Sequence, residues 1–220
     1  MELNGKRIYC LGDSITYGFG VDNPDNIYPA RLAAASGATV FAYGVCGARI
    51  TLHHPAALRG EETPPDISFC VRAEEMDDDA DIVVVFGGTN DFGAKAKLGT
   101  PADRTPDTFY GACHTLFTYL KKKYPAATIL VMTPLHRNPE EHPAPKGGTP
   151  PAPVLSDFCA VLCEVARAYS LPILDLYNKA ASIDPHSEEA CLAYMPDGLH
   201  PNDDGQAVVA DLLLAFLKDL

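Results

Sequence analysis

The chain has 220 residues, of which 47% are hydrophobic and 21% charged, so it is long enough for a continuous core and too apolar for disorder throughout. Its 29 Asp and Glu against 17 Lys and Arg give a net charge of −12, which argues against a nucleic-acid partner and disfavours an anionic membrane surface. No apolar run approaches the ~20 residues that span a bilayer, and we expect a single domain over residues 1–220.

Short apolar runs alternate along the chain with helix-length amphipathic segments. The apolar runs are rich in β-branched or aromatic residues and bounded by Gly, Pro or Asp, which predicts five strands, at Arg7–Leu11, Thr39–Tyr43, Ile82–Phe86, Thr128–Met132 and Pro172–Leu176. Helices are expected at about Ile27–Ala35, Thr108–Lys123, Leu155–Tyr169 and Asp204–Leu217. This alternation predicts an α/β fold in which a five-stranded parallel sheet lies between two layers of helices.

Two segments interrupt the alternation. His53–Asp79 contains Pro55, Pro64 and Pro65 and ends in an acidic run from Glu74, while Asn138–Pro153 is rich in proline. Both are predicted to be long loops, of the kind that often build substrate walls at one edge of an α/β sheet. We interpret the acidic run as a solvated helix face before the third strand.

Ligands of open parallel sheets bind outside the carboxyl ends of the strands, so the residues that follow the strands are the first candidates for chemistry. Ser14 follows the first strand within Gly-Asp-Ser-Ile-Thr, where a strand-to-helix turn would present its hydroxyl and its backbone N–H together. A serine hydroxyl becomes a useful nucleophile when a neighbouring base takes its proton. Alone, the motif is also compatible with a helix cap, and Asp13 is interpreted as a capping or loop-holding residue.

A histidine near the end of the chain supplies the candidate base. Asp197 and His200 lie three residues apart in Asp-Gly-Leu-His-Pro-Asn, so the carboxylate could accept the imidazole Nδ1–H while Nε2 faces outward. The alternative interpretation is a polar cap on the last helix, a role that Asn202 or Asp203 can fill. Among the other histidines, the pair Asp184 and His186 comes nearest to this pattern.

Acyl transfer also needs hydrogen-bond donors aimed at the developing oxyanion. Gly47 follows the second strand and offers a backbone N–H in a turn where the absence of a Cβ lets a substrate approach closely. Asn90 follows the buried third strand in Gly-Thr-Asn-Asp and offers a side-chain amide. With the N–H of Ser14, these groups would make three donors. Each could instead be structural, Gly47 as a turn glycine and Asn90 as a loop-bracing amide.

These four blocks, in this order and over nearly the whole chain, resemble the SGNH hydrolases, also called GDSL-like lipases and acylhydrolases. The resemblance implies a flavodoxin-like three-layer α/β/α sandwich and a serine esterase. It also implies a triad of Ser14, Asp197 and His200, with oxyanion donors from Ser14, Gly47 and Asn90. Tyr28-Pro29 resembles a common feature of the first helix in the family.

The second block departs from the family pattern at two positions. Ala42 stands where the family often has Asn, which we interpret as weaker bracing of the loop, and Cys46 stands where Ser is frequent. A cysteine nucleophile at Cys46 is disfavoured because Ser14 lies in the better-matched block. Cys159 and Cys163 are spaced as on one helix face, but without a CxxC motif or a nearby pair of histidines they are interpreted as buried apolar side chains.

We expect the substrate to be a small-molecule carboxylic ester and the reaction to need no metal or organic cofactor. A short acyl group, such as acetyl, on a carbohydrate or other small polar alcohol is favoured, because the chain is acidic and has no membrane-seating amphipathic stretch. A lysophospholipase or thioesterase, an acyltransferase with the same triad, and an inactive ligand-binding module are the alternatives. The seven Cys do not form a secreted disulfide framework and no secretory leader is visible, so we expect a cytoplasmic protein; the sequence indicates no oligomeric state.

Overall fold

The computed structural model describes residues 1–53, 65–143 and 152–220 and contains a five-stranded parallel sheet. The strands are β1 (Arg7–Gly12), β2 (Thr39–Gly44), β3 (Ile82–Phe86), β4 (Thr128–Met132) and β5 (Ile173–Leu174). Their order in the sheet is β2-β1-β3-β4-β5, and every neighbouring pair is parallel. The predicted parallel sheet is therefore confirmed, and this order is the one found in flavodoxin-like folds.

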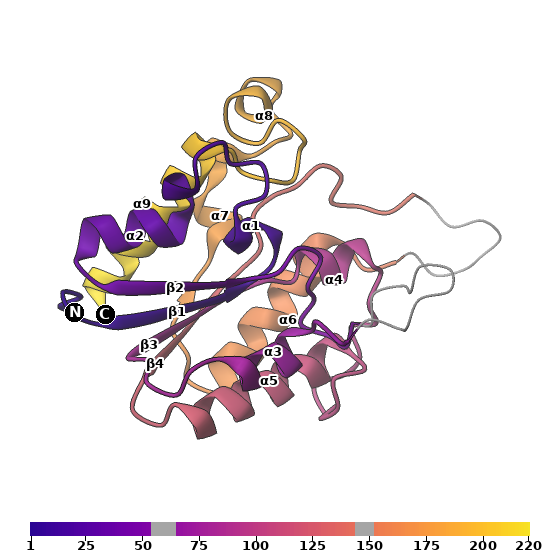
Figure 1. Ribbon diagram of the computed structural model, residues 1–220. Helices are drawn as coiled ribbons and strands as arrows, with labels where there is room; N and C mark the ends of the chain where they lie inside the picture. The colour runs from indigo at the N-terminus through magenta and orange to yellow at the C-terminus, as the bar shows by residue number, and fades with distance from the viewer. Residues whose placement is uncertain (54–64, 144–151) are drawn as a thin grey trace.

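Helices cover both faces of the sheet (Figure 1). One layer contains α2 (Tyr28–Ser36) and α9 (Asp203–Asp219), and the other contains α3 (Phe69–Glu75), α5 (Phe109–Lys123) and α6 (Leu155–Ala168). The four helices predicted from periodicity, α2, α5, α6 and α9, agree with the observed ones to within two residues at each end. The three-layer α/β/α sandwich is confirmed.

The core has two halves because successive residues of a strand point to opposite faces of the sheet. Val83 and Val85 pack into the cluster under α3, α5 and α6, whereas Ile82 and Val84 pack into the cluster under α2 and α9. All five residues of β3 are buried. The absence of polar alternation in this run thus reflects a strand covered on both faces.

The segment His53–Asp79 is not a loop throughout. Helix α3 occupies Phe69–Glu75 within it, begins with a Ser68 side-chain cap and buries Phe69 against the sheet. The acidic run is only partly helical, since α3 ends at Glu75, and Asp79 beyond it forms an ion pair with Arg7 at 2.9 Å. Residues 54–64 lie outside the described residues.

The second predicted loop, Asn138–Pro153, has no helix or strand at 138–143 or 152–153, and its residues 144–151 lie outside the described part.

Short helices also lie outside the predicted helical ranges: α1 (Ser14–Tyr17), which begins at the strand-to-helix turn expected for Ser14, α4 (Thr89–Gly93), α7 (Leu176–Lys179) and α8 (Glu188–Tyr194). Helix α7 shortens the predicted fifth strand, because the Asp175 side chain accepts the Asn178 N–H and starts the helix where a strand was expected. Helices of four to seven residues are too short to show a hydrophobic period, so their starts are visible mainly through the capping residue.

The strand order changes direction at β1, which places a topological switch point between β1 and β3. From β1 the chain moves outward to β2 at the edge and then returns to pair β3 on the other side of β1. Such a switch point is the usual ligand site of an open α/β sheet. Across the described ranges, no helix is long and apolar enough to cross a membrane.

Candidate active site

Ser14 is the first residue of α1, two residues beyond the end of β1. Asp13 caps this helix, since its carboxylate accepts the Ile15 N–H at 2.9 Å. The turn is tight enough to require glycine before it, because a Cβ on Gly12 would lie 1.8 Å from the Thr16 hydroxyl oxygen. Ser14 is therefore held at the carboxyl end of β1, at the switch point.

Buried polar contacts fix the position of α1. Gln206 of α9 donates to the Ile15 carbonyl and accepts the Tyr28 N–H, each at 2.9 Å, and so connects α1, α2 and α9. The hydroxyls of Thr16 and Tyr28 are also 2.9 Å apart. All these groups are buried, and a buried network with every partner in place makes the geometry rigid.

The structure brings the three predicted triad residues together. His200 Nε2 lies 3.0 Å from Ser14 Oγ, and His200 Nδ1 lies 2.6 Å from Asp197 Oδ2. The other carboxylate oxygen of Asp197 accepts the backbone N–H groups of Leu199 and His200 at 2.9 and 2.7 Å. Partial burial tends to raise the pKa of Asp197, but the hydrogen bonds from His200 and Leu199 outweigh it and hold the pKa below its ordinary value. The carboxylate is therefore charged at neutral pH.

The loop that carries His200 is fixed on both sides. Asn202 caps α9 by accepting the Gly205 N–H at 3.0 Å, which is the role that the sequence analysis assigned to Asn202 or Asp203. The Phe19 ring lies against the His200 imidazole, with centroids 4.5 Å apart, and half of the Phe19 side chain is exposed. Phe19 is a site residue that the sequence analysis missed; its signal is an aromatic residue in the glycine-flanked loop after Ser14.

Two further predicted donors lie on neighbouring loops. Gly47 has φ of +78°, a conformation that L side chains rarely adopt. Asn90 is the second residue of α4, and its side-chain amide donates one N–H to the Ala48 carbonyl at 3.0 Å. This bond ties the Gly47 loop to the Asn90 loop and leaves the second amide N–H of Asn90 unused among the described residues. The backbone N–H groups of Ser14 and Gly47 likewise have no acceptor among the residues that the structure describes.

Asp91 fixes the loop that follows Gly47 through buried hydrogen bonds. Its carboxylate accepts the N–H groups of Ile50 and Thr51, both at 2.9 Å, and the Thr51 hydroxyl at 2.7 Å. Complete burial raises the pKa of Asp91 to about 6 although these bonds oppose the rise. The sequence analysis gave Asp91 no role; an acidic residue next to Asn90, directly after a buried strand, is the signal that could have found it.

Arg72 connects the ends of the two strands that precede Ser14 and Gly47. This buried side chain of α3 donates to the Gly12 carbonyl at the end of β1 and to the Tyr43 carbonyl of β2. It lies in the segment predicted to be a loop, so the sequence analysis missed it. A buried guanidinium with carbonyl acceptors on two strands keeps their ends at a fixed separation.

The cysteine alternatives have little support in the structure. Cys46 is exposed as a residue, but its thiol loses part of its hydration to neighbouring atoms. This desolvation and the nearby Asp13 raise the pKa of the thiol, which disfavours the thiolate form needed for attack. Cys159 and Cys163 are buried, as interpreted from the sequence. All seven cysteines are free.

Comparisons with known proteins agree with this arrangement. The model of the GDSL-like lipase/acylhydrolase family matches residues 10–208. One solved structure matches with a TM-score of 0.83 and 31% identity over 100% of this chain and 99% of that chain. A protein from Lactobacillus plantarum matches with a TM-score of 0.81 and 29% identity over 99% and 98%. A lipase/acylhydrolase from Enterococcus faecalis has a TM-score of 0.62 and 23% identity over 97% and 96%, which shows a shared fold.

A search of curated proteins found no match. The family match nevertheless runs through all four blocks, from Gly12 in the first to His200 in the last. It covers most of the chain, and the matched solved structures share its fold from end to end. The chain therefore belongs to the GDSL-like lipase/acylhydrolase family and is a hydrolase of ester bonds.

Proposed function

We propose that Ser14 is the nucleophile of a serine esterase in which His200 is the base and Asp197 orients it. The observation that carries the proposal is the continuous chain of hydrogen bonds from Ser14 Oγ through His200 to Asp197, at 3.0 and 2.6 Å. His200 Nε2 takes the serine proton as Oγ attacks the ester carbonyl, and the Asp197 carboxylate stabilises the imidazolium that forms. His200 then protonates the leaving alcohol, and water enters to release the acid by the same steps in reverse.

The oxyanion of each tetrahedral intermediate would be held by the N–H groups of Ser14 and Gly47 and by the Asn90 amide. These donors come from the loops after β1, β2 and β3, which are adjacent strands. Asn90 and Gly47 are held relative to each other by the bond from Asn90 to the Ala48 carbonyl, so the donors are in place before the substrate arrives. Preorganised donors of this kind each contribute ~10²–10³-fold to the rate.

The favoured substrates are short-chain acyl esters of a carbohydrate or another small polar alcohol. The large hydrophobic side chains that are exposed among the described residues are Tyr17, Phe19, Leu192 and Leu220. Tyr17 and Phe19 lie three and five residues after Ser14 in the chain, and Phe19 contacts His200. Two aromatic side chains offer apolar contact to an acetyl group or to one face of a small ring, whereas a long acyl chain needs a more extended apolar surface.

The first test is hydrolysis of p-nitrophenyl acetate by the purified protein and by Ser14→Ala. The substitution should lower kcat at least ~10³-fold, because the triad acts as one unit. Ser36→Ala is the matched control: its hydroxyl donates to the Leu32 carbonyl on α2, and the variant should hydrolyse the ester at the wild-type rate. Equal turnover by Ser14→Ala and the wild type would exclude Ser14 as the nucleophile.

A panel of p-nitrophenyl esters from C2 to C12 and of acetylated sugars tests the substrate. We expect kcat/KM to be highest for acetyl and to fall with chain length. A maximum at C8 or longer would favour the lipase-like alternative, and product formed on an added acceptor alcohol would favour the transferase. The first outcome contradicts the proposed substrate class, and the second contradicts water as the acyl acceptor. Both leave Ser14 as the nucleophile.

A further inference from the structure

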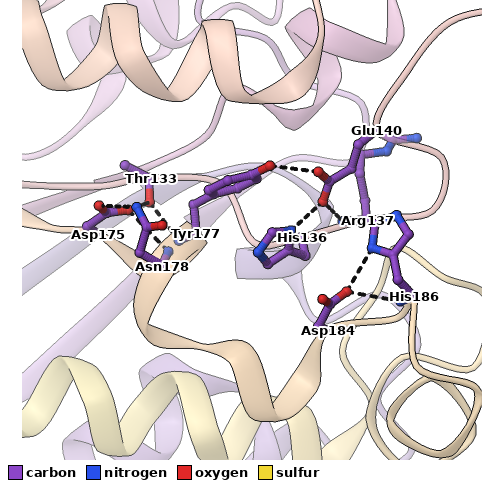
Figure 2. Close-up of polar contacts among 9 residues, drawn as sticks. All are labelled: Thr133, His136, Arg137, Glu140, Asp175, Tyr177, Asn178, Asp184 and His186. Atoms are coloured by element: carbon purple, nitrogen blue, oxygen red, sulfur yellow. Dashed lines mark hydrogen bonds and ion pairs between the residues drawn. The ribbon is translucent and has the colours of Figure 1, made fainter.

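A second cluster of histidine and carboxylate side chains lies outside the proposed triad (Figure 2). His136 and Glu140 belong to the segment after β4, and His186 precedes α8. One potential ligand atom from each of the three lies within 4.8 Å of the other two. Two imidazoles and a carboxylate are a donor set that suits divalent transition metals such as zinc.

The carboxylate of Glu140 is already oriented. Its Oε1 lies 2.5 Å from His136 Nδ1 and accepts the Arg137 N–H at 3.2 Å, while its Oε2 accepts the Tyr177 hydroxyl at 2.7 Å (Figure 2). Hydrogen-bond partners behind a ligand commonly fix its direction in metal sites.

His186 is oriented by a second carboxylate. Asp184 Oδ1 accepts the His186 backbone N–H at 2.9 Å and lies 2.8 Å from His186 Nδ1. The cluster thus combines two imidazoles with the carboxylates of Glu140 and Asp184, a charge balance that favours a divalent cation over neutral or anionic ligands.

We propose that His136, Glu140 and His186 bind a divalent transition-metal ion, with Asp184 as the carboxylate that orients His186. Zinc bonds to nitrogen and oxygen are ~2.0–2.2 Å long, so two ligand atoms of a tetrahedral site lie ~3.4 Å apart. The ion therefore replaces the contact between His136 Nδ1 and Glu140 Oε1, which must open by about 1 Å, a small side-chain rotation. Partial exposure of all three ligands gives the ion access, with side chains 22%, 15% and 45% exposed for His136, Glu140 and His186.

The ion would join two segments that border the proposed triad. Asn138, between His136 and Glu140, donates its N–H to the Gly198 carbonyl at 2.8 Å, and Gly198 lies between Asp197 and His200. Helix α8, the element between His186 and this loop, contains no fully buried residue. A metal ion would therefore stabilise the loop that carries His200 without taking part in ester chemistry. The expectation from the sequence that the reaction itself needs no metal is therefore unaffected.

Isothermal titration of the metal-stripped full chain with zinc chloride tests the proposal. We expect one zinc ion per chain, and visible d–d absorption when Co²⁺ takes its place. His186→Ala should weaken binding by more than ~10-fold. His142→Ala is the matched control, because it removes a histidine from the same segment whose Nε2 contacts the Phe92 carbonyl at 3.0 Å, and it should bind zinc as the wild type does.

Thermal unfolding separates loss of the site from loss of the fold. In EDTA, His136→Ala and His186→Ala should unfold near the wild-type temperature, whereas zinc at a hundredfold excess over Kd should raise the wild-type Tm by roughly 5–10 °C. Neither variant should show that rise. A wild-type chain that binds no zinc, or variants that bind zinc with wild-type affinity, would overturn the proposal.

Discussion

Among the described residues, the pairs Asp197–His200 and Asp184–His186 are alike in their local geometry. In Asp197–His200 and Asp184–His186 the carboxylate lies 2.6 and 2.8 Å from Nδ1, and in each it also accepts the backbone N–H of its own histidine. The pKa of both aspartates is lowered. Taken alone, either pair could orient an imidazole for proton transfer.

The two pairs differ in what surrounds the imidazole. His200 faces Ser14 at the carboxyl end of β1, close to the loops of Gly47 and Asn90, whereas His186 belongs to the cluster of His136 and Glu140. The same dyad therefore fits a general base at one place and a metal ligand at the other. A histidine–carboxylate pair becomes informative about function only through its third partner.

The largest expected difference between the two pairs is in the kcat/KM of variants in which one aspartate is replaced. Asp197→Asn should lower kcat/KM for p-nitrophenyl acetate by ~10³–10⁴-fold, because the amide cannot stabilise the imidazolium and favours the wrong tautomer. Asp184→Asn should reduce it by less than ~10-fold, since Asp184 acts on a different histidine. Asp211→Asn, on the exposed face of α9, is the control for the chemical change itself and should have wild-type activity. An Asp197→Asn activity within tenfold of wild type would remove Asp197 from the triad.

Removal of the Asn90 amide, a proposed oxyanion donor, should lower activity less than Asp197→Asn does. It would show how much of the activity at the Ser14 site depends on the oxyanion donors. Asn90→Ala should lower kcat by ~10²–10³-fold with little change in KM, because the amide acts on charge that develops after binding. Asn4→Ala, at an exposed position near the N-terminus, should leave both constants unchanged. If Asn90→Ala instead raises KM at constant kcat, Asn90 contributes to substrate binding and not to the oxyanion site.

The smallest effect is expected in the pH dependence of the free energy of unfolding, and it should be similar for Asp184 and Asp197. A carboxyl group whose pKa is lower in the folded than in the unfolded chain stabilises the fold above its unfolded value, here 3.8, and that contribution is lost as the pH falls through the folded pKa. Asp184→Asn and Asp197→Asn should each make the free energy of unfolding less dependent on pH below about 4. Urea unfolding between pH 2.5 and 5 measures the slope. A steeper slope in either variant would contradict the lowered pKa values.

The sequence predicted the fold where the pattern is long enough to have a period. The helices α2, α5, α6 and α9 and the strands β1 to β4 follow from apolar periodicity and bounding residues. Helix α3 was missed because it has seven residues and lies within a proline-containing segment, and the fifth strand was overextended because Asp175 caps a helix there. Local capping competes with strand propensity at such positions, and a window average does not detect it.

The candidate site was predictable to the extent that its residues lie in short blocks after strands. Ser14, Gly47 and Asn90 are found in this way, whereas His200 is found from Asp197 three residues before it. The structure brings Ser14 and His200 within hydrogen-bond distance. Arg72 and Phe19 could not be placed, because their roles depend on contacts with segments far along the chain or across a loop. The cluster around Glu140 was missed for the same reason: His136 and His186 are far apart in sequence and meet only through the fold.

The hydrogen bonds of Gln206 make the position of Ser14 depend on the last helix, α9. Ser14 and His200 are 186 residues apart, and Gln206 on the last helix connects α9 to α1 and α2 near the start of the chain. A nascent chain that has already formed β1 to β5 still lacks both the base and the side chain that fixes the helix of Ser14. On the proposed mechanism, docking of α9 completes one half of the core and holds Ser14 and His200 together, so we expect ester hydrolysis only from chains in which α9 has docked.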